Sequence, residues 1–367
     1  MKIARLIKLG RSVKKISVGG SNSSRLGSID LLRGFAALSI LIWHYQHFYY
    51  YSNQVQGDLL VSSPPYEIFE FIRLINFEGV QVFWVISGVV LGRSYIPRLR
   101  SRKSFLVNRL ARLYPLHLLT LIIVASLQLI ANLKLSHSLI YSDNSLQHFF
   151  WSLILISGWG PSPGFSFNGP IWSVSVEIVI YFFFILIVGF LRASTIFTAF
   201  IFLFCFAGLY LFVQPHFIFS CGFFFFFGIL INQIFSRKSL SLNLAGVMIL
   251  VLVEFKFALN GLSFLPVIYT WLVLNFERFS FVNRKSITKI SQFFGKVSYG
   301  IYLIHVPVQI FLLLIALVLK INMKELADNI IFFSLYISIV VVLAIISYKF
   351  FEEPLRKKIL NIKYLNT

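Results

Sequence analysis

The sequence carries a few ionisable side chains inside long apolar segments, and these residue types support proton transfer and anion binding. Arg33 and His44 lie eleven residues apart in one apolar stretch. That separation turns an α-helix about 20° past three full turns and advances it by about 16 Å, so both side chains are expected on one face. A neutral imidazole acts as a general base near pH 7, and a guanidinium binds anions. His47 is expected on a neighbouring face and is a second candidate base.

A cluster of basic residues follows the second apolar segment. Arg109 and Arg112 close this cluster, one helical turn apart, just before Tyr114 and Pro115. Clusters of this kind often only set membrane topology or bind anionic lipid. Because an arginine fork matches phosphate oxygens with two hydrogen bonds, the pair also predicts a phosphate-binding site. Ser87, a small polar residue in the preceding segment, joins the same candidate binding set.

Two more ionisable residues interrupt later apolar segments. Glu177 shares a helical face with Ser173, four residues earlier. His305 closes a row of polar residues at helical spacing, the others being Ser298, Tyr299 and Tyr302. Because ionisable groups inside a membrane span are costly, Glu177 and His305 are candidates for orienting reacting groups or binding a substrate.

The composition requires a membrane to position these residues. Hydrophobic residues make up 58% and charged residues 13% of the chain, and the mean hydropathy is +0.83. Soluble domains average roughly 45–50% apolar and about 25% charged residues. The net charge of +20 would suggest nucleic acid in a soluble protein, but cytoplasmic loops of membrane proteins are basic without such a partner. Cys205 and Cys221 lie in apolar runs and are interpreted as buried or lipid-facing hydrophobes, and no metal site is expected.

The apolar segments predict an all-α polytopic membrane protein. A spanning helix needs about 20 mostly apolar residues, so segment 149–160 is too short to cross. We therefore expect about ten transmembrane helices plus one short re-entrant or interfacial segment. The predicted membrane segments are 31–50, 77–96, 113–133, 149–160, 172–191, 194–213, 215–235, 240–258, 261–276, 293–319 and 329–350.

The distribution of Lys and Arg predicts the orientation of these spans. With ten spans, 28 of the 33 Lys and Arg residues lie on the side of the N-terminus. Since cytoplasmic segments are rich in these residues, both termini are expected in the cytoplasm. We expect a basic tail at 1–28, a membrane domain at 29–353 and a second basic tail at 354–367. Pro354 is expected to end the last helix.

Taken in order, these elements resemble the acyltransferase-3 family of integral-membrane O-acyltransferases, which includes enzymes that acetylate bacterial surface polysaccharides. The resemblance covers roughly residues 28–357, and Gln81 departs from an aspartate often found in the second-span motif. The matching segments are LRGFAAL with the following WH, GVQVFWVISGVVLG, FLVNRLARLYPLH, GPIWSVSVEIVIYF, GKVSYGIYLIHVPV and FFEEPLRK.

The resemblance implies transfer of an acyl group, most often acetyl, from cytoplasmic acyl-CoA to a hydroxyl of a surface glycan or glycolipid. It implies a location in the bacterial inner membrane. His44 would act as general base or as transient acyl carrier, and Glu177 and His305 would assist it or bind the acceptor. The donor, acyl-CoA, would be held by Arg33, Arg109, Arg112 and Ser87. The alternatives are a non-enzymatic permease or flippase for an anionic or lipid-linked solute and a lipid-acylating enzyme of another family.

Overall fold

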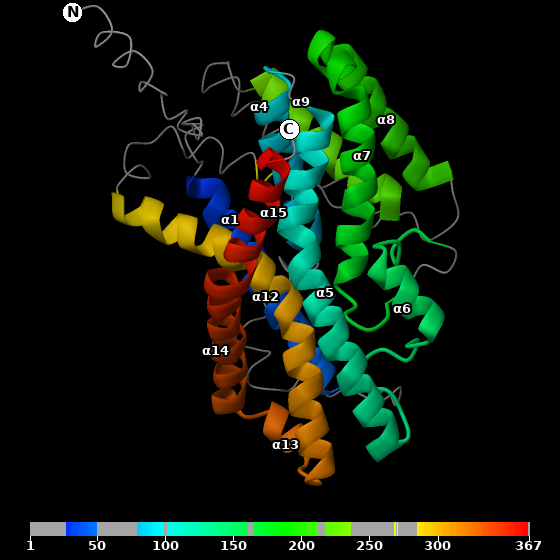
Figure 1. Cartoon of the computed structure of the whole chain (residues 1–367), viewed down its shortest axis with the longest axis vertical. Helices are drawn as coiled ribbons and strands as arrows, with labels where there is room; N and C mark the ends of the chain where they lie inside the picture. Colours follow the sequence, from blue (N-terminus) through cyan, green and yellow to red (C-terminus); the bar gives the residue numbers. More distant parts are fainter. Residues whose placement is uncertain are drawn as a thin grey trace, which may run out of the picture.

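The computed structural model describes residues 27–49, 79–98, 101–160, 165–211, 217–235, 268, 270 and 285–365, and these residues contain no β-strand. The bundle in Figure 1 is formed by α1 (Gly27–Trp43), α4 (Gly79–Tyr95), α5 (Arg102–Leu135), α7 (Ile171–Ala193), α8 (Thr195–Leu211), α9 (Phe217–Phe235), α12 (Lys285–Val318) and α14 (Ile330–Ser347). The shorter elements are η1 (His44–Phe48), α6 (Leu146–Leu153), α13 (Met323–Ala327), η3 (Tyr348–Glu352) and α15 (Glu353–Leu365).

Five stretches of the described helices are long and apolar enough to cross a membrane, which confirms the predicted all-helical, multi-span type of fold. They are Arg102–Leu135, Ile171–Ala193, Phe217–Ile234, Lys289–Val318 and Ile330–Ile362. The number of ten spans stays a prediction. Predicted spans 240–258 and 261–276 lie outside the described residues, except for residues 268 and 270.

The remaining described helices also match the predicted segments. Helices α1, α4 and α8 have 17 residues each. They overlap the predicted spans 31–50, 77–96 and 194–213, respectively. Helix α6 has eight residues, and at about 1.5 Å per residue it is too short to cross a bilayer, as predicted for segment 149–160. Apolar side chains cover the outer faces of the bundle: Leu133 is 76% and Ile196 is 83% exposed. Such faces suit contact with lipid.

Helix α12 is the central element of the bundle. It packs against α1, α5 and α14 and also touches η1, α13 and η3 (Figure 1). Two glycines permit the close contact between α12 and α1. A Cβ atom at Gly34 would overlap the Phe294 side chain, and a Cβ atom at Gly295 would overlap the Asp30 side chain. Helix α12 therefore lies close to the beginning of α1, where Arg33 is located.

Helices α4 and α9 approach each other through their backbones. A Cβ atom at Gly88 would overlap the carbonyl oxygen of Phe225, and one at Gly228 would overlap the carbonyl oxygen of Val85. The small residues of the second predicted span thus serve tight helix packing, as expected. This packing also fixes the position of Ser87, the neighbour of Gly88.

The α-helix of the first span ends earlier than predicted. It stops at Trp43, and residues His44–Phe48 form a 3₁₀-helix. In a 3₁₀-helix the side chains at positions i and i+3 eclipse each other. His47 therefore lies over the same side as His44, and the expectation that it occupies a neighbouring face is wrong.

The last helix does not stop at Pro354, contrary to the prediction. Helix α14 passes into a π-helical turn, η3, and the chain continues as α15 to Leu365. Proline is tolerated in the first turn of a helix because the amide hydrogen it lacks has no intrahelical acceptor there. Part of the predicted C-terminal tail is thus an ordered helix, and it brings Arg356 back to the bundle.

We expect Gly88→Ala to destabilise the protein, because the added methyl group must push α4 and α9 apart. Overpacking of this kind typically costs about 1–3 kcal/mol. Thermal unfolding of the detergent-purified protein should begin at a lower temperature than in the wild type. The matched control is Gly189→Ala, since no atom lies within 4 Å of a Cβ at that position. Equal unfolding temperatures for the two variants would contradict the close approach of α4 and α9.

Candidate active site

Two cavities adjoin each other in the half of the bundle that contains the beginning of α1. The larger has a volume of about 380 Å³ and the smaller of about 70 Å³. Arg33, Arg112 and Tyr299 line both cavities and therefore form their junction. These three residues come from α1, α5 and α12, so the junction lies where the central helix meets two neighbours.

The larger cavity is rich in charge, and its cations outnumber its carboxylates. The cationic side chains are Arg33, Arg93, Arg112, Lys296 and Arg356, and the acidic ones are Asp30, Glu352 and Glu353. Such a surface suits a ligand with several negative charges. Sequence reasoning missed Lys296, Glu352 and Arg356, because only the fold brings α12, η3 and α15 to the cavity. It also missed Asp30, although the i, i+3 spacing from Arg33 on α1 is a local signal.

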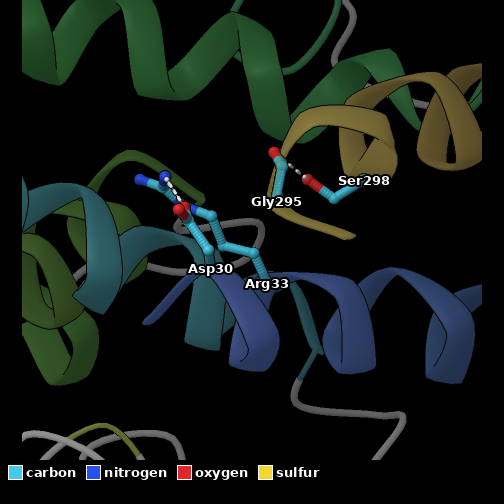
Figure 2. Close-up of polar contacts among 4 residues, drawn as sticks. All are labelled: Asp30, Arg33, Gly295 and Ser298. Carbon is cyan, nitrogen blue, oxygen red and sulfur yellow. Dashed lines mark hydrogen bonds and ion pairs between the residues drawn. The ribbon is translucent and has the colours of Figure 1, made fainter. Parts of the chain in front are cut away.

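Two of the carboxylates are paired with arginines. The Nη1 atom of Arg33 lies 3.4 Å from Oδ1 of Asp30, and the Nη1 atom of Arg356 lies 3.2 Å from Oε2 of Glu353. Figure 2 shows the Asp30–Arg33 pair on α1 beside the turn of α12 in which Ser298 donates to the carbonyl of Gly295. Within the described part of the chain, Arg112 forms no ion pair, so its charge is available to a ligand.

Besides Arg33 and Arg112, the smaller cavity gathers three more of the predicted site residues. Ser87, Arg109 and Glu177 all line it. The hydroxyl of Tyr181 donates to Oε1 of Glu177 and lies 3.2 Å from Oγ of Ser87. The guanidinium carbon of Arg109 lies 5.2 Å from the centre of the Tyr181 ring. Tyr181 therefore joins the three residues into one polar network and is a site residue that the sequence alone did not indicate.

Tyr302 forms another wall of the smaller cavity. Its hydroxyl donates to the carbonyl of Pro170 over 2.8 Å and lies 2.7 Å from Oγ of Ser173. These bonds tie α12 to the beginning of α7, the helix that carries Glu177. Ser298 and Tyr299 line the same cavity, so the predicted polar face of this span is confirmed.

The predicted histidines lie together behind Tyr302. The ring centres of Tyr302 and His305 are 6.2 Å apart, and those of His305 and His44 are 4.8 Å apart. The His47 ring centre lies 5.0 Å from that of His44. His305 is fully buried, whereas His44 and His47 are partly exposed. We refer to His44, His47 and His305 as the histidine cluster; none of them lines either cavity.

The loop after α5 closes the histidine cluster on one side. The Tyr141 ring lies edge-on to His47, with the two ring centres 5.6 Å apart. Burial raises the pKa of the Tyr141 phenol well above its ordinary value, so this hydroxyl remains protonated. Among the residues that the structure describes, no set of three His, Cys, Asp or Glu side chains is arranged to hold a metal ion. The cysteines Cys205 and Cys221 are free and buried, as expected.

Comparison with known proteins identifies the family of the chain. Residues 26–349 match the family model of the acyltransferase domain. The chain belongs to the acyltransferase-3 family. The chain is 30% identical over 159 residues to acyltransferase MdmB of Streptomyces mycarofaciens, a match that covers 43% of the chain and 38% of the relative. It is 33% identical over 105 residues to nodulation protein 10 of Rhizobium leguminosarum bv. viciae, covering 27% of the chain and 24% of the relative.

The matches thus span well under half the length of either curated relative, and no solved structure matches the chain. The family match itself covers the helices that carry Arg33, Ser87, Arg112, Glu177 and the histidine cluster. Both cavities are therefore built mainly from the acyltransferase domain, and α15 adds Arg356 from beyond the matched residues.

Proposed function

We propose that this acyltransferase moves an acyl group, most often acetyl, from cytoplasmic acyl-CoA to a hydroxyl of a surface glycan or glycolipid. Support for the donor comes from the larger cavity, where cationic side chains surround a space of about 380 Å³. Coenzyme A carries several phosphate charges, and arginine forks bind phosphate oxygens well. Arg33 and Arg112 are the proposed phosphate contacts, with Arg356 and Lys296 beside them.

The observation that carries this proposal is the junction of the two cavities at Arg33, Arg112 and Tyr299. An anionic donor bound in the larger cavity would extend its thioester arm through this junction into the smaller one. There the arm would meet a polar network that includes Ser87, Arg109 and Glu177. A site with a cationic entrance and a polar interior suits a donor with charged phosphates at one end and an uncharged acyl group at the other.

The histidine cluster supplies the proposed base. His44 Nε2 would take the proton from the acceptor hydroxyl as the hydroxyl oxygen attacks the thioester carbonyl and forms the new C–O bond. The C–S bond then breaks, and the CoA thiolate takes up this proton to leave as the thiol. Arg109, which lines the smaller cavity, would supply positive charge to the developing oxyanion. Glu177 and His305 would orient the reacting groups. In the alternative route, His44 itself would carry the acyl group transiently.

The proposed location is the bacterial inner membrane, with both termini in the cytoplasm and the acceptor bound from the opposite side. The Lys and Arg distribution supports this orientation. Membership of an acyltransferase family disfavours the permease or flippase alternative. Purified protein that releases one CoA for each acylated acceptor would support transfer, whereas solute movement without CoA release would support the transporter.

We expect a cysteine placed at Ser101 to be protected from a membrane-impermeant thiol reagent in intact cells and labelled in lysed cells. Ser101 is exposed at the beginning of α5, on the side predicted to be cytoplasmic. The two native cysteines are buried, so background labelling should be low. Labelling of Ser101→Cys in intact cells would reverse the proposed orientation.

We expect Arg112→Ala to weaken acetyl-CoA binding by about tenfold or more, because a charge-assisted contact to phosphate contributes about 1.5–3 kcal/mol. Arg112→Lys should rescue poorly, since an ammonium lacks the planar fork. Isothermal titration of the purified protein with acetyl-CoA measures this effect. Arg98→Ala is the control, because Arg98 is exposed and lines neither cavity. Equal affinities for the two alanine variants would remove Arg112 from the donor site.

We expect His44→Ala to lose transfer by about 10²–10⁴-fold while still binding acetyl-CoA, because general-base catalysis supplies a rate factor of that size. Wild-type activity should rise with pH as the imidazole becomes neutral. The measurement is transfer of labelled acetyl from acetyl-CoA to surface-glycan extract at matched protein levels. His137→Ala, an exposed histidine in the loop after α5, is the control. More than about a tenth of wild-type transfer would exclude His44 as the base and make His305 the leading candidate.

A further inference from the structure

One buried side chain connects the histidine cluster to the central helix. Gln309 is fully buried on α12, one turn beyond His305. Its Nε2 atom donates to the backbone carbonyl of His44 over 2.6 Å, and its Oε1 atom lies 3.1 Å from Nδ1 of His47. Gln309 thus bonds to both ends of the first 3₁₀ turn of η1.

These two contacts determine where the proton of His47 resides. A backbone carbonyl only accepts hydrogen bonds, so the amide nitrogen of Gln309 must face His44. The amide oxygen then faces His47, and it too only accepts. Nδ1 of His47 therefore carries the proton and donates it to Gln309, and Nε2 of His47 keeps its lone pair.

The other two histidines have the same tautomer. Nδ1 of His44 lies 2.9 Å from the carbonyl oxygen of Ile40, and Nδ1 of His305 lies 3.2 Å from that of Ile301. Each Nδ1 must carry a proton to make these bonds. All three Nε2 atoms are therefore acceptors, and that of His305 is buried with no hydrogen-bond partner among the described residues. The cluster is arranged to receive a proton or a hydroxyl donor.

We infer that Gln309 is a positioning residue for the base: it fixes the 3₁₀ turn that holds His44 and keeps His47 as an uncharged neighbour. The inference rests on the proposed function, in which His44 accepts a proton. With ring centres 5.0 Å apart, a charged His47 would oppose protonation of His44. Because the acceptor for the Nδ1 proton of His47 is an uncharged amide, this hydrogen bond does not favour the charged form of His47 as a carboxylate would.

The groups around His47 are consistent with this role. On η1 itself it faces His44, and on α12 the nearest titratable side chains are His305 and Tyr302. Tyr141 faces it from the loop after α5. At the end of α13, which packs against η1, the Asp328 carboxylate accepts from the hydroxyl of Tyr49. Among the described residues, the hydrogen-bond and ring partners of His47 are Gln309, His44 and Tyr141, and none of them is a carboxylate.

The test compares Gln309→Met and Gln309→Glu with wild type as full-length protein in detergent. Gln309→Met removes both hydrogen bonds at similar volume, and we expect kcat to fall by tenfold or more with donor affinity unchanged, because small displacements of a base are costly. Gln309→Glu places a carboxylate on His47, and we expect the acidic limb of the pH–rate profile to move up by about one pH unit or more.

Gln128→Met is the matched control. Gln128 is equally buried and bridges the backbone of Leu139 through its amide nitrogen and oxygen, but it lies on α5, outside the histidine cluster. This variant should lose stability and keep the kcat of the folded fraction and its pH profile. If Gln309→Met behaves in the same way, or if the profile of Gln309→Glu overlays that of wild type, the inference is overturned.

A measurement independent of catalysis completes the test. Nitrogen-15 NMR of histidine-labelled protein distinguishes the two tautomers, with the His47 signal assigned from its absence in His47→Ala. We expect the Nδ1–H form in wild type and a mixture in Gln309→Met. An Nε2–H form of His47 in wild type would overturn the inference even if transfer from acetyl-CoA proceeds. Absence of transfer with the expected tautomer would instead count against the proposed function alone.

Discussion

An ionised side chain away from water costs several kcal/mol unless a partner compensates for the lost hydration. This cost governs the arrangement of the whole bundle. Arg33 has Asp30 on its own helix, and Arg356 has Glu353 on its own helix. Arg109 lies over the ring of Tyr181, which in turn bonds to Glu177. The charged groups are thus concentrated around two adjoining cavities, and the outer faces of the helices remain apolar.

Helix α12 holds this arrangement together because it touches both cavities and the histidine cluster. Gly295 leaves space for Asp30, Tyr299 forms part of the junction, and Tyr302 fixes the beginning of α7. Further along, His305 and Gln309 contact η1. A single helix therefore sets the relative positions of the larger cavity, the smaller cavity and the histidine cluster. A rotation or shift of α12 along its axis would move side chains in all three.

Helical spacing was enough to predict the polar face of α12, the shared face of Ser173 and Glu177, and the short segment around α6. The sequence did not predict the change to 3₁₀ geometry at His44, because hydrogen bonds from Gln309, 265 positions later, hold that turn. Nor did it predict the continuation past Pro354, which depends on a π-helical turn in the preceding residues. Lys296 and Arg356 joined the site only through tertiary contacts, which local periodicity does not encode, whereas the i, i+3 spacing of Asp30 and Arg33 is a local signal.

An anion that binds in the larger cavity must compete with carboxylates that are already paired with arginines there. Asp30 and Glu353 already compensate two of the guanidinium groups, so an incoming anion gains only the difference between its own contacts and those it displaces. For a small monovalent ion such as chloride this difference is slight. A polyphosphate group engages several cations at once, including Arg112, and its advantage grows with each contact. In the proposed donor site, the internal acids would therefore lower the gain for abundant salt anions, while a group that engages several cations at once would keep its advantage.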